Sequence, residues 1–171
     1  NMRSKSAYNF TREDLYKITE ICRKAGVKSY LTVNTIIYDG DLTYMRQLID
    51  DAAAADVSAI IASDVAAMTY ARKVGVHLST QLNISNTEAL RFYAQFADVV
   101  VLARELNMEQ VDAIHQAIET DPITGPKGEP IRIEMFAHGA LCMAVSGKCY
   151  LSLHELNKSA NRGSCGQVCR R

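Results

Sequence analysis

The sequence has little of what marks disordered, membrane-spanning or exported proteins. Three of its 171 residues are proline, whereas 48% are hydrophobic and 22% are charged, a balance typical of a globular domain. No window approaches the ~18 uninterrupted apolar residues of a membrane span, so no membrane partner is expected. The opening "NMRSKSAYNF" lacks the apolar core of a secretory signal. We therefore expect a cytoplasmic protein, where cysteines are metal ligands or redox groups more often than disulfides.

The sequence also lacks net charge, because 19 Lys and Arg residues balance 19 Asp and Glu residues. No global field therefore indicates a nucleic-acid or membrane partner. The charges are unevenly spread, however. Residues 142–171 hold five positive residues and one negative residue, which leaves +4 there and −4 in the remainder. A solvated polar loop and an anionic partner both explain this excess.

Five β-rich runs alternate with amphipathic stretches along the chain. The runs predicted to be strands are residues 27–35, 57–63, 76–80, 98–106 and 131–139. The stretches between them predict helices, with capping-box patterns at Asn107 and Thr11 and glycine ends at Gly26 and Gly75. Strands that alternate with helices form right-handed βαβ units, so the fold class predicted is α/β with a parallel sheet.

The architecture expected is a partial TIM-type (β/α) barrel. No glycine-rich phosphate turn follows any run, which argues against a dinucleotide-binding sheet. A complete barrel needs about 250 residues, so five units are either an excerpt of a longer chain or a sheet that never closes. We assign residues 1–171 to a single domain, in which residues 139–171 are a cysteine-rich loop segment.

Polar residues follow the expected strands, where an α/β barrel places its active site. The candidates for a substrate-binding set are His77, Gln81, Asn83, Arg104, Glu105, Glu134 and His138. Asn34, Asp64 and Asn86 also follow strands, but helix capping explains each of them as well. Amide, carboxylate, imidazole and guanidinium groups together suit a pocket for a polar small molecule or a nucleobase.

Motifs for hydrolysis are missing. The sequence contains neither a Gly-x-Ser-x-Gly elbow nor a His-Glu-x-x-His helix. Ser146 could be activated by His138, but nothing in their spacing requires it. The catalytic residues stay unassigned from sequence.

Four cysteines gather near the end of the sequence: Cys142, Cys149, Cys165 and Cys169. The intervals between them hold six, fifteen and three residues, which fit neither the usual zinc ribbon nor the usual ferredoxin run. Neighbouring glycines would let the backbone fold closely around an inorganic cluster. An iron–sulfur cluster, a zinc ion and inert or redox thiols all remain open, whereas Cys22 is expected to be a small core residue.

Longer segments then resemble a known family. Residues 134–152, "EMFAHGALCMAVSGKCYLS", are similar to the signature of the collagenase-like peptidase family U32, and "NRGSCGQVCR" resembles the segment that follows it there. Upstream, "HLSTQLNISN" and "VVLAREL" resemble family blocks in the same order. The resemblance covers nearly the whole chain and implies an internal fragment of a longer member.

The resemblance implies two kinds of activity. The family name implies hydrolysis of peptide bonds, and some members are collagenases. Other members hydroxylate a uridine in tRNA or a cytidine in rRNA, with prephenate implicated and a 4Fe–4S cluster held by four cysteines. Carried over to this chain, Cys142, Cys149 and Cys165 occupy ligand positions. The fourth ligand is either Cys169 or a residue beyond Arg171, in which case this chain alone would hold no cluster.

The favoured hypothesis is therefore an iron–sulfur-dependent RNA hydroxylase. The strand-end residues would bind the base or a prephenate-like small molecule, while Lys148, Arg162, Arg170 and Arg171 would contact RNA phosphates. The alternatives are a U32-type peptidase and a non-enzymatic protein with a structural metal.

Overall fold

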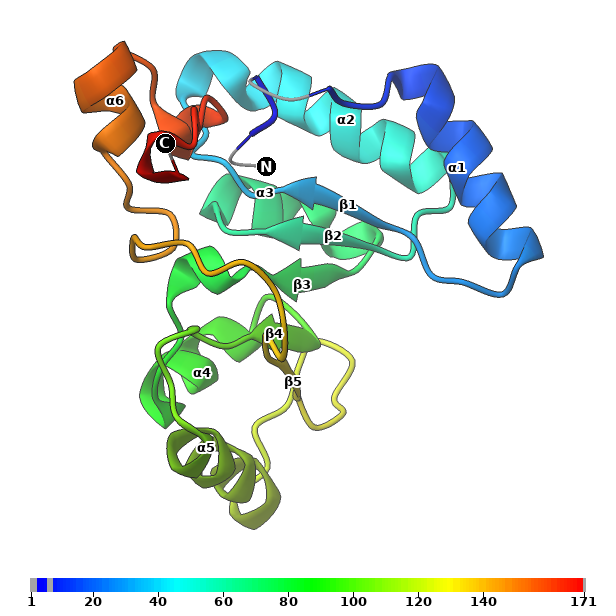
Figure 1. Ribbon diagram of the computed structural model, residues 1–171. Helices are drawn as coiled ribbons and strands as arrows, with labels where there is room; N and C mark the ends of the chain where they lie inside the picture. The colour runs from blue at the N-terminus through cyan, green and yellow to red at the C-terminus, as the bar shows by residue number, and fades with distance from the viewer. Residues whose placement is uncertain (1–2, 6–7, 171) are drawn as a thin grey trace.

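The computed structural model describes residues 3–5 and 8–170, and it confirms the α/β class (Figure 1). The strands are β1 (Tyr30–Val33), β2 (Ala59–Ala62), β3 (Val76–Leu78), β4 (Val99–Val101) and β5 (Arg132–Glu134). The α-helices are α1 (Arg12–Lys24), α2 (Leu42–Ala54), α3 (Val65–Tyr70), α4 (Thr87–Ala94), α5 (Met108–Thr120) and α6 (Leu151–Leu156). Each β-rich run of the sequence contains one strand, which is shorter than the run.

All five strands are parallel and stand in the sheet in chain order, β1-β2-β3-β4-β5. Each strand thus pairs with the strand that follows it in the sequence, as in a TIM barrel. Because all five strands are parallel, their carboxyl ends lie at the same edge of the sheet. The loops that follow the strands meet at that edge, which makes it the place to look for a site.

The helices begin and end where the local sequence predicts. Thr11 and Asn107 form capping boxes with Asp14 and Gln110. Asp64 and Asn86 cap α3 and α4 through hydrogen bonds to backbone amides. These bonds satisfy amides of the first turn that have no partner inside the helix.

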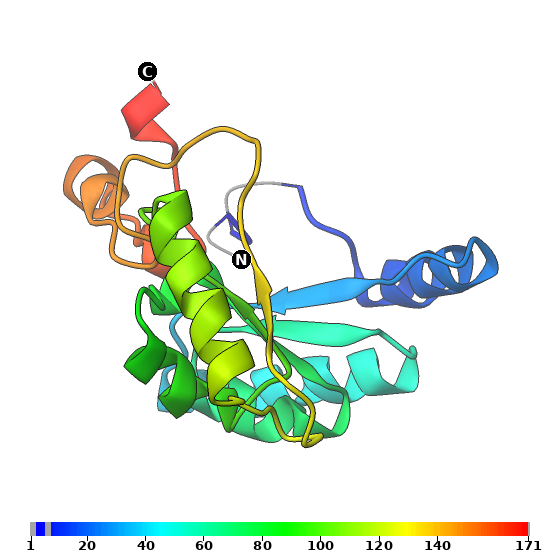
Figure 2. The same ribbon diagram turned by 90° about the horizontal axis from the view of Figure 1, so that it is seen from below.

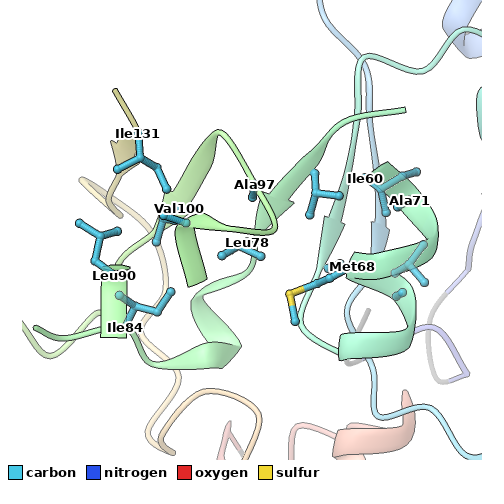
Figure 3. Close-up of a cluster of buried hydrophobic side chains, with 14 of the residues drawn as sticks. Ile60, Met68, Ala71, Leu78, Ile84, Leu90, Ala97, Val100 and Ile131 are labelled. Atoms are coloured by element: carbon cyan, nitrogen blue, oxygen red, sulfur yellow. The ribbon is translucent and has the colours of Figure 1, made fainter. Parts of the chain in front are cut away.

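The core lies between the sheet and the helices. Figures 1 and 2 show α2 to α5 on one side of a curved sheet, while the chain after β5 passes over the other side. Side chains alternate along β3, so that Val76 and Leu78 are buried whereas His77 points away from the core. Figure 3 shows Leu78 among Ile60, Val100 and Leu90 from neighbouring strands and from α4. These apolar contacts fix the helices on the sheet.

The segment 139–171 is more ordered than the loop that the sequence predicted. It contains α6 and two 3-10 turns, η4 (Ala160–Arg162) and η5 (Val168–Arg170). Figure 1 shows this segment at the carboxyl edge of the sheet, near the heads of the strand arrows. Arg171 lies outside the described residues. Within the described part of the chain, no helix is both long and apolar enough to cross a bilayer.

Candidate functional site: a cysteine-lined cavity

A cavity of about 530 Å³ lies at the carboxyl ends of the strands. Its walls come from the residues that follow β1, β3, β4 and β5, from the chain's last thirty or so described positions and from Arg3 near the start. All four clustered cysteines line it: Cys142, Cys149, Cys165 and Cys169. The fold therefore brings to one cavity four thiols that are spread over 28 positions of the sequence, from 142 to 169.

The thiols have the chemistry of an iron–sulfur ligand set. All five cysteines of the chain are in the thiol form, and Cys22 lies on α1 and does not line the cavity. Among the described residues, no three His, Cys, Asp or Glu side chains come close enough to hold one metal ion. A four-iron cluster takes one thiolate at each corner, so these four cysteines are the candidate ligands for one.

Arg104 docks the first cysteine loop onto the sheet edge. It lies just after β4, and all three of its guanidinium nitrogens donate to the loop. Nε bonds the Ser146 hydroxyl at 3.0 Å, Nη1 the Cys142 carbonyl at 3.3 Å and Nη2 the Ala144 carbonyl at 3.0 Å. The planar fork of arginine suits such multiple acceptors. Arg104 lines the cavity, but these three N–H donors bind the cysteine loop itself, whereas the sequence predicted that Arg104 binds substrate.

The turn after β3 provides a second anchor for the same loop. Asn83 donates from Nδ2 to the Ser146 carbonyl at 2.9 Å and to the Gln81 carbonyl at 2.9 Å. Its φ of 54° is left-handed, a conformation that Asn tolerates better than most residues. Gln81 lines the cavity and accepts a hydrogen bond from Ser63 at 3.2 Å. Asn83 thus supports the cavity from behind, while Gln81 forms part of its wall.

The later cysteines depend on contacts within the carboxyl-terminal segment. The Cys149 amide donates to the Asn161 Oδ1 at 3.1 Å, and Asn161 is 5% exposed. The Gly166 amide, next to Cys165, donates to the buried hydroxyl of Ser152 on α6 at 3.0 Å. Asn161 and Ser152 are two buried polar residues that sequence reasoning did not single out. Their hydrogen bonds to the amides of Cys149 and Gly166 form only when α6 and η4 are folded against each other.

Arg162 attaches the carboxyl-terminal segment to the loop after β1. Its guanidinium forms an ion pair with Asp41, donates to the Ile36 carbonyl at 3.0 Å, and lies 3.9 Å from the centre of the Tyr38 ring. The hydrogen bond from Arg162 holds the pKa of Asp41 below its usual value. Arg162 was predicted to contact RNA, but these contacts already engage it. Lys148 and Arg170 are exposed, and Arg170 also lines the cavity.

The cavity is positively charged and offers an unused acceptor. Its positive charges are those of Arg3, Arg104 and Arg170, and no carboxylate occurs among the described lining residues; His138 also lines it. Asn34, which follows β1, donates to the Ser79 hydroxyl at 3.1 Å, whereas its buried Oδ1 accepts no bond from the described residues. Of the three residues with a capping alternative, Asn34 is the one that does not cap a helix. An anion with an N–H or O–H donor would match this lining.

Three predicted substrate-binding residues lie apart from the cavity. His77 and Glu134 face each other on the open side of the sheet, with 3.8 Å between Nδ1 and Oε2. The centre of the His77 ring lies 4.9 Å from that of the Tyr30 ring, and the two planes are tilted by 40°. Burial lowers the pKa of His77 and outweighs the opposing effect of Glu134. Glu105 is exposed and lines neither this cavity nor a smaller one of about 130 Å³ beside His77. Of the predicted set, Gln81, Arg104 and His138 therefore line the main cavity, while Asn83 supports its wall and the other three lie elsewhere.

Comparison with known proteins identifies the family. The model of peptidase family U32 matches residues 1–171. The chain belongs to peptidase family U32. A U32 relative from Porphyromonas gingivalis, named collagenase, is 75% identical over 100% of this chain and 42% of its own length. The 23S rRNA 5-hydroxycytidine C2501 synthase of Escherichia coli is 37% identical over 92% of this chain and 23% of its own length.

A solved structure supports the fold. The U32 peptidase Mk0906 superposes with a TM-score of 0.59 at 14% identity, covering 78% of this chain and 55% of that one. This chain therefore spans less than half the length of these curated relatives and about half of the solved neighbour. The family includes relatives named for peptide hydrolysis and relatives named for RNA hydroxylation, so membership alone allows either reaction.

Proposed function

We propose that this U32 chain carries the cluster-binding site of an enzyme that hydroxylates a pyrimidine in tRNA or rRNA. The observation that supports this proposal most is the lining of the cavity at the strand ends. It contains four cysteines and several arginines, and no carboxylate occurs among its described residues. Cys142, Cys149, Cys165 and Cys169 would hold a 4Fe–4S cluster. When bound, this cluster would supply electron transfer or a site for an oxygen donor. Reduced thiols and an RNA substrate both suit the cytoplasm.

The chain's own residues would bind and orient the substrates. Arg170 and Lys148, exposed near the cavity, would meet RNA phosphates, an attraction that weakens as salt rises. Phe136 lines the cavity and is 59% exposed, so its ring is available to stack on an unpaired base. The Asn34 Oδ1 would accept a hydrogen bond from the base edge. The cavity's positive charge would also favour a dianion such as prephenate.

The decisive experiment is mass analysis of nucleosides from tRNA and rRNA of cells that lack the gene. We expect one pyrimidine nucleoside to lose one oxygen atom and to regain it when the full-length gene is restored. A gene carrying Cys149→Ser should fail to restore it, whereas Cys22→Ser should succeed because Cys22 lies outside the cavity. An unchanged nucleoside profile in the deletion strain would refute the proposal.

A peptidase is the second candidate, because a relative that is 75% identical is named collagenase. Ser146 is buried and accepts a hydrogen bond from Arg104, whose guanidinium cannot take up the proton of an attacking hydroxyl. This contact makes Ser146 a poor nucleophile. If the full-length protein cleaved gelatin and Ser146→Ala abolished the cleavage, the peptidase would replace the hydroxylase as the better explanation.

A further inference from the structure

Arg104 was expected to bind substrate, yet its contacts indicate another task. Its three guanidinium nitrogens reach the Cys142 carbonyl, the Ala144 carbonyl and the Ser146 hydroxyl, at 3.3, 3.0 and 3.0 Å. These acceptors alternate along five consecutive residues that form no helix or strand. Binding them to one planar group bends the segment 142–146 around the guanidinium.

The residues that precede Arg104 are buried and hydrogen-bonded on both sides. The neighbouring backbone amides of Leu102 and Ala103 donate to the Glu134 and Ile84 carbonyls, each at 2.9 Å. Both side chains are buried, with 1% and 7% of their surface exposed. Arg104 therefore extends from a fixed point of the core to a loop that has little hydrogen bonding of its own.

The two cysteines of this loop are held by different residues. Cys142 is bonded through its carbonyl to Arg104, whereas Cys149 is bonded through its amide to Asn161. Between them, Asn83 holds the Ser146 carbonyl at 2.9 Å. A change at Arg104 should therefore affect the position of Cys142 and leave that of Cys149.

We propose that Arg104 is a positioning residue that holds Cys142 at the wall of the cavity by binding the backbone of its loop. This inference rests on the proposed function for its purpose, the placing of a cluster ligand, but not for its geometry. Lysine cannot replace Arg104, because one ammonium group on a flexible stem cannot reach three separate acceptors in fixed directions.

Hydrogen–deuterium exchange of the full-length, metal-free protein tests the clamp directly. In Arg104→Lys and Arg104→Gln, exchange within residues 142–148 should become about tenfold faster at the Lys148 amide, which donates to the Val145 carbonyl at 3.1 Å. Arg104 binds the residues on both sides of Val145, so its loss should open the turn that this bond closes. Residues 151–162 should exchange as in the wild type. Ser146→Ala removes one of the three contacts and should give a smaller increase at the Lys148 amide.

Arg91→Lys is the matched control, since Arg91 pairs with Asp121 at 2.7 Å on the surface, away from the cavity. It should leave exchange in both segments unchanged. Unchanged exchange of residues 142–148 in Arg104→Lys would overturn the proposal. A uniform increase over the whole chain would also overturn it, because Arg104 would then be a general stabilising residue.

A second measurement links the clamp to the cluster. After reconstitution with iron and sulfide, Arg104→Lys should release iron to a chelator about tenfold faster than the wild type, and Arg91→Lys should match the wild type. If the wild type takes up no iron, the proposed function fails while the exchange experiment still decides the role of Arg104. Equal release rates for Arg104→Lys and the wild type would contradict a positioning role toward the cluster.

Discussion

Gly147 occupies a position that two separate constraints reserve for glycine. Its φ is +76°, and an added Cβ would lie 3.1 Å from the Gln81 Cβ and 3.3 Å from the Gln81 carbonyl oxygen. The close approach lets the cysteine loop pack directly on the turn after β3. The absence of a side chain at Gly147 therefore allows the loop to pack against Gln81.

We expect Gly147→Ala to lower the free energy of unfolding by about 1–3 kcal/mol, from left-handed backbone strain and the clash with Gln81. Gly40→Ala is the control, because nothing lies within 4 Å of an added Cβ there and its φ is not left-handed. Urea denaturation of the full-length variants measures both. Equal midpoints for the two variants would contradict the close packing of the loop on Gln81.

His77 should make stability depend on pH. Burial lowers its pKa in the folded protein, and nearby Arg132 and Lys28 lower it further, against Glu134 and Asp98. Below about pH 6.5 the unfolded chain takes up a proton that folded His77 does not. The free energy of unfolding therefore falls as pH drops from there through the folded pKa, and levels off below it.

The measurement is urea denaturation at about pH 7.5 and about pH 5.5, on either side of the ordinary histidine pKa. His77→Asn should reduce the loss of stability at the lower pH, whereas His115→Asn on the exposed face of α5 should keep it in full. An identical pH dependence in His77→Asn and the wild type would show that another group is responsible.

At the scale of elements, α4 depends on a single central leucine. Leu90 is fully buried and packs toward Leu78 and Ile84, as Figure 3 shows. Leu90→Ala should lower the free energy of unfolding by about 2–5 kcal/mol, because the shortened side chain leaves a cavity in the core. Ile21→Ala on α1, where Ile21 is 65% exposed, should change it by less than about 0.5 kcal/mol. Thermal denaturation of both variants compares the two sites.

Elements with strong local patterns were predictable from the sequence. The helix starts at Thr11 and Asn107 and the five strands follow from capping boxes and apolar runs. Helix α6 was missed because no capping side chain marks its start, whereas Asp64 marks the start of the equally short α3.

The site itself was predictable only in part. The grouping of four cysteines in the sequence indicated a shared site, and all four line one cavity. The clamp of Arg104 on Cys142 joins residues 38 positions apart, a contact that no local pattern encodes. His77 and Glu134 follow the strand-end rule by sequence, yet the pleat turns His77 toward the open face of the sheet, where the two meet.

For the whole molecule, the side chain of Arg162 and one backbone bond, from the Ile36 amide to the Asn161 carbonyl at 3.1 Å, connect the carboxyl-terminal segment to the first βα unit. Arg162→Met would remove its ion pair with Asp41 and its bond to the Ile36 carbonyl. We expect chymotrypsin to cut the segment after the exposed Tyr150 roughly fivefold faster in the variant, since the loss of such bonds favours local opening. Lys158→Met, at an exposed position outside this contact, should be cut at the wild-type rate. Equal rates for both variants would show that other contacts hold the segment.

The reach of Arg162 also has a consequence for the order of folding. Each strand pairs with its immediate successor, so the sheet can grow as the chain leaves the ribosome. The bond from Arg162 to Ile36 closes a loop of 126 positions, and long loops close late because they cost the most chain entropy. The cysteines would thus be brought together on the five strands after these have paired. Cluster delivery would then act on a finished binding surface during maturation, as a step after the sheet has formed.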